Sequence, residues 1–110
     1  YERLTIYLGE AEHWQGKPTY LALVEAARQH GLMGATVLRG LTGYGKKNHD
    51  RKVLLGMIEL SSDLPMVITL IDNREKIEGF LPIVQSMVGG GIVLRDTVEV
   101  VHPAPLTQSP

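Results

Sequence analysis

The 110-residue chain contains no cysteine. This absence excludes disulfide bonds, thiolate nucleophiles, and zinc or iron–sulfur sites with cysteine ligands. Small secreted domains often depend on disulfides, so the composition favours a cytoplasmic location. Aromatic residues are also scarce, at 5% of the chain, and Trp14 is the only tryptophan. We expect Trp14 to pack at a subunit contact rather than to stack on a nucleic-acid base.

Long apolar runs and a strong net charge are missing as well. No apolar stretch approaches the roughly 20 residues that cross a bilayer. The formal net charge is −1, whereas general affinity for nucleic acid or for anionic membranes requires a broad basic field. The composition therefore indicates a globular protein that does not bind nucleic acid, and its length fits a single domain.

What the sequence does contain is an alternation of strand and helix patterns. Residues 3–8 alternate polar and apolar side chains with a period of two, as a half-buried strand does. Further strands are predicted at 35–41, 66–71 and 92–101, and helices between Pro18 and Gly31 and between Asp72 and Gly89. The segment 53–60 is apolar and fits either a returning strand or an irregular packed segment.

The helix signals point to particular residues. Gly31 is placed to end the first helix in a left-handed conformation. Asp72 with Glu75 resembles a capping box at the start of the second helix. Helical spacing predicts the apolar faces: Tyr20, Val24 and Ala27 on the first helix, and Ile77, Leu81, Val84 and Val88 on the second.

The order of these elements, β-α-β-β-α-β, predicts the fold. It is an α+β fold, the ferredoxin-like βαββαβ sandwich, in which an antiparallel sheet carries two helices on one face. We expect residues 1–102 to form this domain and the proline-rich residues 103–110 to form a disordered tail.

The third predicted strand is apolar on both of its faces. Met66, Ile68 and Leu70 alternate there with Val67 and Ile71. Because both helices lie on one side of such a sheet, the other face is left uncovered. A second copy of the chain is the simplest cover, so we expect the protein to assemble with itself.

A glycine-rich, basic segment follows the second strand. Gly40, Gly45 and Lys46 satisfy the G-x-x-x-x-G-K spacing of a phosphate-binding loop, but Lys47 stands where that motif needs a Ser or Thr hydroxyl for magnesium. No apolar helical face follows, which also argues against a hydrolytic loop of this type. Two interpretations remain: a hairpin end with solvated lysines, or a basic loop, residues 42–52, whose root contributes to an anion site.

Three glycines, Gly89, Gly90 and Gly91, follow the second helix. One glycine is enough to end a helix. Three in a row leave successive N–H groups free to surround a phosphate, next to a strand that carries Arg95. The alternative is a turn that needs glycine only for close packing, and the sequence alone leaves both open.

Catalytic and metal-binding motifs are not recognisable. His13, His30, His49 and His102 show none of the spacings typical of metal sites, and no G-x-S-x-G motif occurs. A nucleotide-using enzyme would need a set of magnesium ligands that the sequence does not offer. The chain is therefore expected not to be an enzyme and to carry no cofactor.

Taken together, these segments resemble the PII-like family catalogued as domain of unknown function 190, over residues 2–101. The stretches that carry the resemblance are Arg3 to Glu10 (RLTIYLGE), Gly16 to Pro18, Gly34 to Gly40 (GATVLRG) with Gly43-Tyr44-Gly45, Asp63 to Pro65, and Ile77 to Gly91. The resemblance implies ferredoxin-like subunits that form a trimer and bind nucleotide in the clefts between subunits.

The resemblance also implies which residues bind the ligand. They are Arg39, Gly43, Tyr44, Gly45, Lys46, Gly89, Gly90, Gly91 and Arg95. The glycine–aromatic–glycine stretch matches the start of the long PII loop, and the glycine triplet falls at the PII phosphate loop. The triplet lacks the acid and the lysine that PII proteins carry there. No tyrosine lies between Lys46 and Lys52, so signalling through a modified tyrosine is not expected.

The function implied is that of a non-enzymatic, cytoplasmic regulator. It would be a homotrimer that binds an adenine nucleotide or a similar small anion, and would regulate a partner such as a membrane transporter or channel through the basic loop. The alternative is a metal- or ion-binding structural trimer, like the copper-tolerance relatives with this architecture. The lack of cysteine and of paired histidines counts against that alternative.

Overall fold

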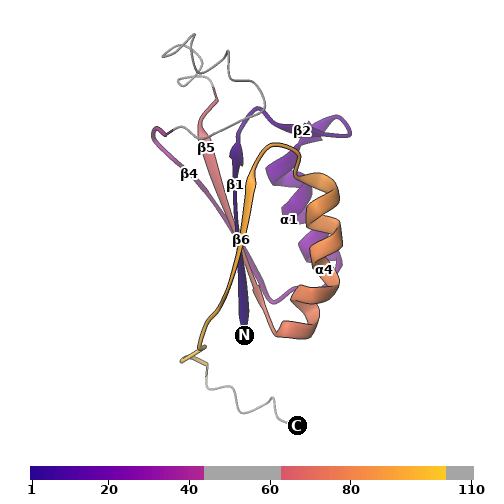
Figure 1. Ribbon diagram of the computed structural model, residues 1–110, viewed down its shortest axis with the longest axis vertical. Coiled ribbons are helices and arrows are strands. Elements are labelled where there is room, and N and C mark those ends of the chain that lie inside the picture. Colours follow the sequence, from indigo (N-terminus) through magenta and orange to yellow (C-terminus); the bar gives the residue numbers. More distant parts are fainter. Residues whose placement is uncertain (44–62, 104–110) are drawn as a thin grey trace.

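A computed structural model describes residues 1–43 and 63–103 of the chain. The principal elements are β1 (Glu2–Gly9), α1 (Thr19–Gln29), β4 (Gly34–Arg39), β5 (Pro65–Asp72), α4 (Arg74–Met87) and β6 (Ile92–Thr97) (Figure 1). A short hairpin of β2 (His13–Trp14) and β3 (Lys17–Pro18) precedes α1. The predicted apolar segment 53–60 lies outside the described residues.

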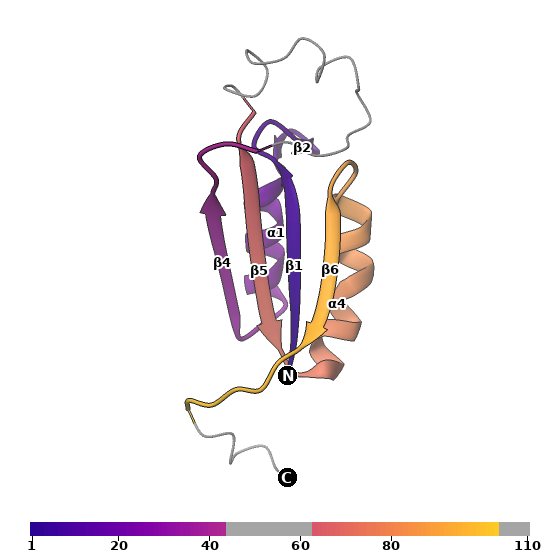
Figure 2. The same ribbon diagram turned by 60° about the vertical axis from the view of Figure 1, so that its left-hand side comes forward.

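One four-stranded sheet carries both helices on the same face. The strand order is β4-β5-β1-β6, and each neighbouring pair is antiparallel. Helices α1 and α4 cover one face of the sheet, and no helix of residues 1–43 or 63–103 covers the other (Figures 1 and 2). This arrangement confirms the predicted ferredoxin-like sandwich. Neither helix described is long and apolar enough to span a membrane.

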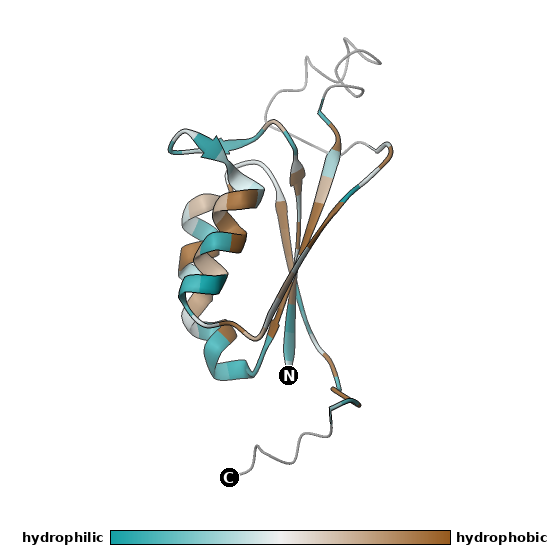
Figure 3. Cartoon of the chain, turned by 180° about the vertical axis from the view of Figure 1, so that it is seen from behind, coloured by the Kyte–Doolittle hydropathy of each residue, from teal (hydrophilic) through white to brown (hydrophobic). Residues whose placement is uncertain are grey.

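The core lies between the sheet and the helices. Leu4, Ile6 and Leu8 of β1 are buried, because alternate residues of a strand point to the same face. They pair in register with the buried residues Leu70, Ile68 and Met66 of β5. Each side chain of this size contributes about 1.5–3 kcal/mol when fully buried. The strands accordingly carry long brown stretches in Figure 3, whereas the β2–β3 hairpin is mostly teal.

The buried face of α1 differs from the predicted one by about one residue, although Ala27 is buried as predicted. The side chains that pack on the core are Ala22, Leu23, Ala26 and Ala27, together with buried Thr19. Tyr20 lies at the margin of the core. A shift of one residue turns a helix by about 100°, and the small alanines let α1 approach the sheet closely. Gly31 ends the helix with φ of 73°, which confirms its predicted left-handed conformation.

Helix α4 is capped one residue later than predicted. Asn73 is the N-cap, and its side-chain oxygen accepts a hydrogen bond of 2.9 Å from the Lys76 N–H. The carboxylate of Asp72 instead accepts bonds from the N–H groups of Asn73 and Met33, and so joins the end of β5 to the segment before β4. The buried residues Ile77 and Val84 were predicted correctly, and Phe80 was missed.

Strand β6 is shorter than the predicted strand 92–101. It ends at Thr97, which pairs with Glu2, the first residue of β1. After Thr97 the N–H of Val98 donates one further hydrogen bond, of 2.9 Å, to the carbonyl oxygen of Tyr1. Most of the predicted tail, residues 104–110, lies outside the described part of the chain.

The face of the sheet away from the helices, here called the open face, is built of three rows across the four strands. The rows are Leu38, Val67, Tyr7 and Ile92; then Thr36, Thr69, Thr5 and Leu94; then Gly34, Ile71, Arg3 and Asp96. Leu38, Ile92 and Leu94 are each more than half exposed. The open face is therefore apolar towards the Ile92 end and charged towards the Asp96 end, and β5 is apolar on both faces as predicted.

Candidate functional site

The candidate residues that the structure describes gather, with one exception, at one end of the sheet. Arg39 ends β4, Gly43 follows it, and Gly89 to Gly91 connect α4 to β6. The α4–β6 connection lies at the same end as the β2–β3 hairpin (Figures 1 and 2). Tyr44, Gly45 and Lys46 lie outside the described residues. The exception is Arg95.

The start of the long β4–β5 connection packs against its end. The N–H of Gly40 donates a hydrogen bond of 2.7 Å to the carbonyl oxygen of Pro65. A Cβ at Gly40 would lie 2.7 Å from Cγ of Pro65, so only glycine allows this close approach. Gly43 packs against the same proline, with 3.3 Å between its ideal Cβ position and Cγ. Two stretches that carried the family resemblance therefore meet at this point.

A tight turn after β1, residues Gly9 to Glu12, holds both ends of that connection. We call it the β1 turn, and a 3.1 Å bond from the Glu12 N–H to the Gly9 carbonyl closes it. The N–H groups of Glu10 and Ala11 donate to the Leu64 carbonyl (2.8 Å) and to the Asp63 carboxylate (2.9 Å). The Glu10 carboxylate forms an ion pair of 2.6 Å with Arg39.

The same turn also contacts the glycine triplet, here called the glycine turn. The N–H of Gly89 donates a 3.0 Å hydrogen bond to Oε2 of Glu12. A Cβ on Gly91 would overlap the Tyr7 carbonyl oxygen and lie 3.1 Å from Cβ of Leu8. Close packing therefore accounts for Gly91, as one of the two sequence interpretations held. Among the described glycines only Gly16 and Gly31 have positive φ, so none of the three has the left-handed conformation of an αR–αL anion nest.

The two halves of the candidate site do not meet within one subunit. Arg39 and Gly43 lie at the β4 edge of the sheet, and Gly89 to Gly91 at the β6 edge. Two strands separate these edges, so about 14 Å lies between them at ~4.8 Å per strand. The β1 turn occupies the space between the two halves.

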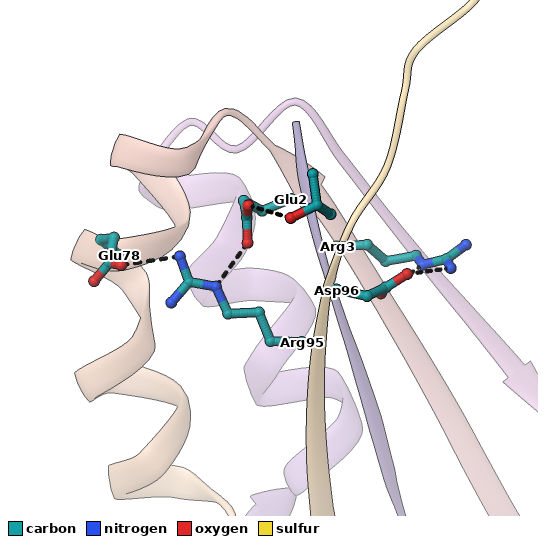
Figure 4. Close-up of polar contacts among 6 residues, drawn as sticks. Glu2, Arg3, Glu78, Arg95 and Asp96 are labelled. Carbon is teal, nitrogen blue, oxygen red and sulfur yellow. Dashed lines mark hydrogen bonds and ion pairs between the residues drawn. The ribbon is translucent and has the colours of Figure 1, made fainter.

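Arg95 lies elsewhere, on the side of the sheet that carries the helices. It is four residues along β6 from Gly91, or about 13 Å. Its guanidinium is bound to Glu2 at 2.7 Å and to Glu78 of α4 at 2.9 Å (Figure 4). The hydrogen bond to Glu2, and then that to Glu78, raises the pKa of Arg95. In the structure Arg95 therefore links β6 and β1 to α4, and it does not lie at the glycine turn.

A second ion pair lies on the open face. Arg3 and Asp96 are neighbours across β1 and β6, and their closest approach is 2.6 Å (Figure 4). The hydrogen bond from Arg3 lowers the pKa of Asp96, as the hydrogen bonds from Arg95 and then Thr97 lower the pKa of Glu2. Both carboxylates favour the charged form in the fold.

Acid should therefore destabilise the fold through Glu2 and Asp96. A carboxylate whose pKa is lowered by folding contributes stability above its unfolded pKa, and loses it as pH falls through its folded pKa. We expect the melting temperature to fall as pH drops from about 5 to about 3. Glu2→Gln should melt lower than wild type at neutral pH but lose less on acidification. The exposed Glu99→Gln, which changes no ion pair of the described residues, is the control. Parallel pH curves for Glu2→Gln and wild type would contradict this assignment.

Sequence reasoning missed the acidic residues that organise this end of the sheet. Glu10 and Asp63 belonged to the stretches that resembled the family, but nothing indicated that they would bind the β4–β5 connection and the β1 turn. Glu12 carried no signal at all, since its contact with Gly89 spans 77 residues of chain.

Comparison with known proteins places the chain in a family. Residues 1–100 match the DUF190 family (Uncharacterized ACR, COG1993). A UPF0166 protein of Aquifex aeolicus (strain VF5) is 44% identical over 99 residues, covering 90% of this chain and 91% of that protein. The UPF0166 protein MJ1524 of Methanocaldococcus jannaschii is 30% identical over 95 residues, covering 84% of this chain and 85% of that protein.

Solved structures share the fold at low sequence identity. TTHA0516 of Thermus thermophilus, described as PII-like, has a TM-score of 0.57 and 17% identity, covering 91% of this chain and 88% of its own. CPII of Thiomonas intermedia, bound to ADP, AMP and acetate, has a TM-score of 0.54 and 20% identity, covering 93% of this chain and 89% of its own. The chain therefore belongs to the DUF190 family and has the fold of the PII-like proteins, as its sequence resemblance indicated.

Proposed function

We propose that the protein is a non-enzymatic regulator of the PII type. It forms a homotrimer and binds an adenine nucleotide or a similar small anion in the clefts between subunits. It regulates a partner, such as a membrane transporter, through the basic loop between β4 and β5. The supporting likeness is to CPII, whose structures contain ADP and AMP, or ADP and bicarbonate.

The observation that carries the proposal is the separation of the two halves of the site. Arg39 and the start of the long connection lie at one edge of the sheet, and the glycine turn lies at the other. A phosphate chain cannot contact both halves within one subunit across about 14 Å of intervening strands. When subunits associate around an axis, however, one edge of each sheet comes to face the opposite edge of its neighbour. A ligand between subunits then contacts Arg39 of one copy and the glycine turn of the next.

The open face supports the assembly on which this site depends. Leu38, Ile92 and Leu94 expose apolar surface there, with Tyr7 between them. Contiguous exposed apolar surface of this kind is typical of protein–protein contacts. The face also lies on the opposite side from α1 and α4, so covering it leaves the helices free.

Calorimetric titration with ADP, AMP and ATP tests the proposed site. We expect one adenine nucleotide to bind per subunit, and Arg39→Ala to weaken binding by about 1.5–3 kcal/mol through loss of a charge-assisted hydrogen bond. Arg28→Ala, on the exposed side of α1, removes the same charge and should change the affinity little. Equal losses of affinity in both variants would mean that overall charge attracts the nucleotide and that Arg39 does not contact it specifically. The absence of binding heat for all three nucleotides would contradict the proposed ligand class.

A further inference from the structure

The glycine turn already holds an anion in this structure. Oε2 of Glu12 accepts the hydrogen bond from the Gly89 N–H at 3.0 Å, and it lies 3.8 Å from the position that a Cβ on Gly89 would take. No lysine or arginine of residues 1–43 and 63–103 forms an ion pair with Glu12. The partner of this carboxylate is thus the backbone amide that an anionic ligand of the glycine turn would use.

The backbone of Glu12 is fixed on both sides. Its N–H donates to the Gly9 carbonyl within the β1 turn, and its carbonyl accepts a 2.9 Å hydrogen bond from the N–H of Thr19 at the start of α1. With the backbone already fixed, the contact costs only the rotamer freedom of the Glu12 side chain itself. The contact with Gly89 is therefore prepared by the fold.

We infer that Glu12 is an internal competitor of the anionic ligand and must leave the glycine turn before that ligand binds. The inference rests on the proposed function and adds its regulation. Two anions cannot share one amide donor, and like charges about 4 Å apart repel each other. The Glu12 carboxylate thus keeps the Gly89 N–H hydrogen-bonded when no ligand is present. It also lowers the affinity for the ligand, which must displace it.

Departure of Glu12 also reaches the β4–β5 connection. The β1 turn that carries Glu12 donates the hydrogen bonds from Glu10 and Ala11 to Leu64 and Asp63. Loss of the contact between Glu12 and Gly89 removes one of the hydrogen bonds that hold this turn, which touches both halves of the site in the described part of the chain. Amide exchange at Glu10 and Ala11 should change when ADP binds.

The test is the affinity for ADP of Glu12→Gln, measured by calorimetry beside wild type. Glutamine keeps the length of the side chain and a weaker hydrogen bond to Gly89 but removes the charge, so we expect ADP to bind about fivefold more tightly or better. Glu99→Gln makes the same change in net charge at the far end of β6 and should leave the affinity within about twofold. Glu12→Asp, which keeps the charge but is one methylene shorter, should tighten binding as well and guards against an effect of net charge alone.

Each outcome decides between the two proposals. Tighter binding by Glu12→Gln, or binding by that variant when wild type shows none, supports the competition. Equal or weaker binding by a folded Glu12→Gln, with wild type binding ADP, overturns the competition and leaves the proposed function standing. If neither protein binds ADP, AMP or ATP, the proposed function fails and the competition fails with it.

Discussion

Gly91→Ala should lower the free energy of unfolding by about 2–4 kcal/mol, whereas Gly89→Ala should change it by less than about 1 kcal/mol. The added methyl group at Gly91 overlaps the carbonyl oxygen of Tyr7 and approaches Cβ of Leu8. These atoms belong to β1, which pairs with both β5 and β6. The clash cannot be relieved by rotating one side chain, so the start of β6 must move away from β1. At Gly89 the nearest atom is a carboxylate oxygen at 3.8 Å, an ordinary contact.

Chemical denaturation of the two variants beside wild type checks this prediction. Both substitutions replace glycine by alanine in the same turn, so the loss of backbone freedom in the unfolded chain is similar and largely cancels. The difference between the variants then reports the contact with β1. Equal stabilities would mean that the turn relaxes without cost, and that Gly91 is needed for another reason.

Leu94→Lys should break the assembly into monomers. Leu94 lies on the open face of β6 in a row with Thr5, next to Ile92 of the apolar row. Leu94 is already about half buried in the subunit, so in a trimer that covers this face the substitution removes up to about 1–1.5 kcal/mol of apolar burial from each subunit. It also adds the cost of burying an unpaired ammonium group. Because each trimer contains three substituted subunits, it loses this stabilisation three times. Light scattering at micromolar concentration should give three times the monomer mass for wild type and one times for the variant.

Leu21→Lys is the matched control for this experiment. Leu21 of α1 is 45% exposed and Leu94 is 51% exposed, but Leu21 lies on the helical side of the sheet. The control makes the same chemical change and the same change in net charge, and should leave a trimer. Wild type that is monomeric and well folded would contradict the homotrimer. Wild type and Leu94→Lys that are both trimeric would move the interface away from the open face.

The order of elements and the layers could be predicted from the sequence because their signals are local. The period of two in β1 and the helical spacing of Ile77 and Val84 depend only on neighbouring residues. The errors occurred where a distant contact decides the outcome. The extent of β6 depends on its pairing with β1, and the buried face of α1 depends on how closely its alanines approach the sheet.

The candidate site could be predicted only in part, for the same reason. Glycine-rich stretches are visible in the sequence, so Gly40, Gly43 and the glycine turn could be named as candidates. The pairing of Arg95 with Glu2 and Glu78 could not be seen, because Glu2 lies 93 residues away. Ion pairs between residues so far apart in the chain produce no periodic pattern in the sequence. The prediction of Arg95 as a ligand contact therefore could not take into account its place in a link between a strand and a helix.

The β1 turn has a consequence for any partner of the protein. One turn binds the ends of the β4–β5 connection through Glu10 and Ala11, and the glycine turn through Glu12. If displacement of Glu12 by a ligand also shifts this turn, occupancy at the glycine turn and at the β4–β5 connection is thermodynamically linked. Such coupling is reciprocal: if a ligand at the glycine turn changes the affinity for a partner by some factor, the partner changes the affinity for the ligand by the same factor. A partner that binds at Leu64 and Asp63 and favours the state in which Glu12 contacts Gly89 would thus lower the affinity for nucleotide. One that favours the displaced turn would retain the nucleotide on the protein.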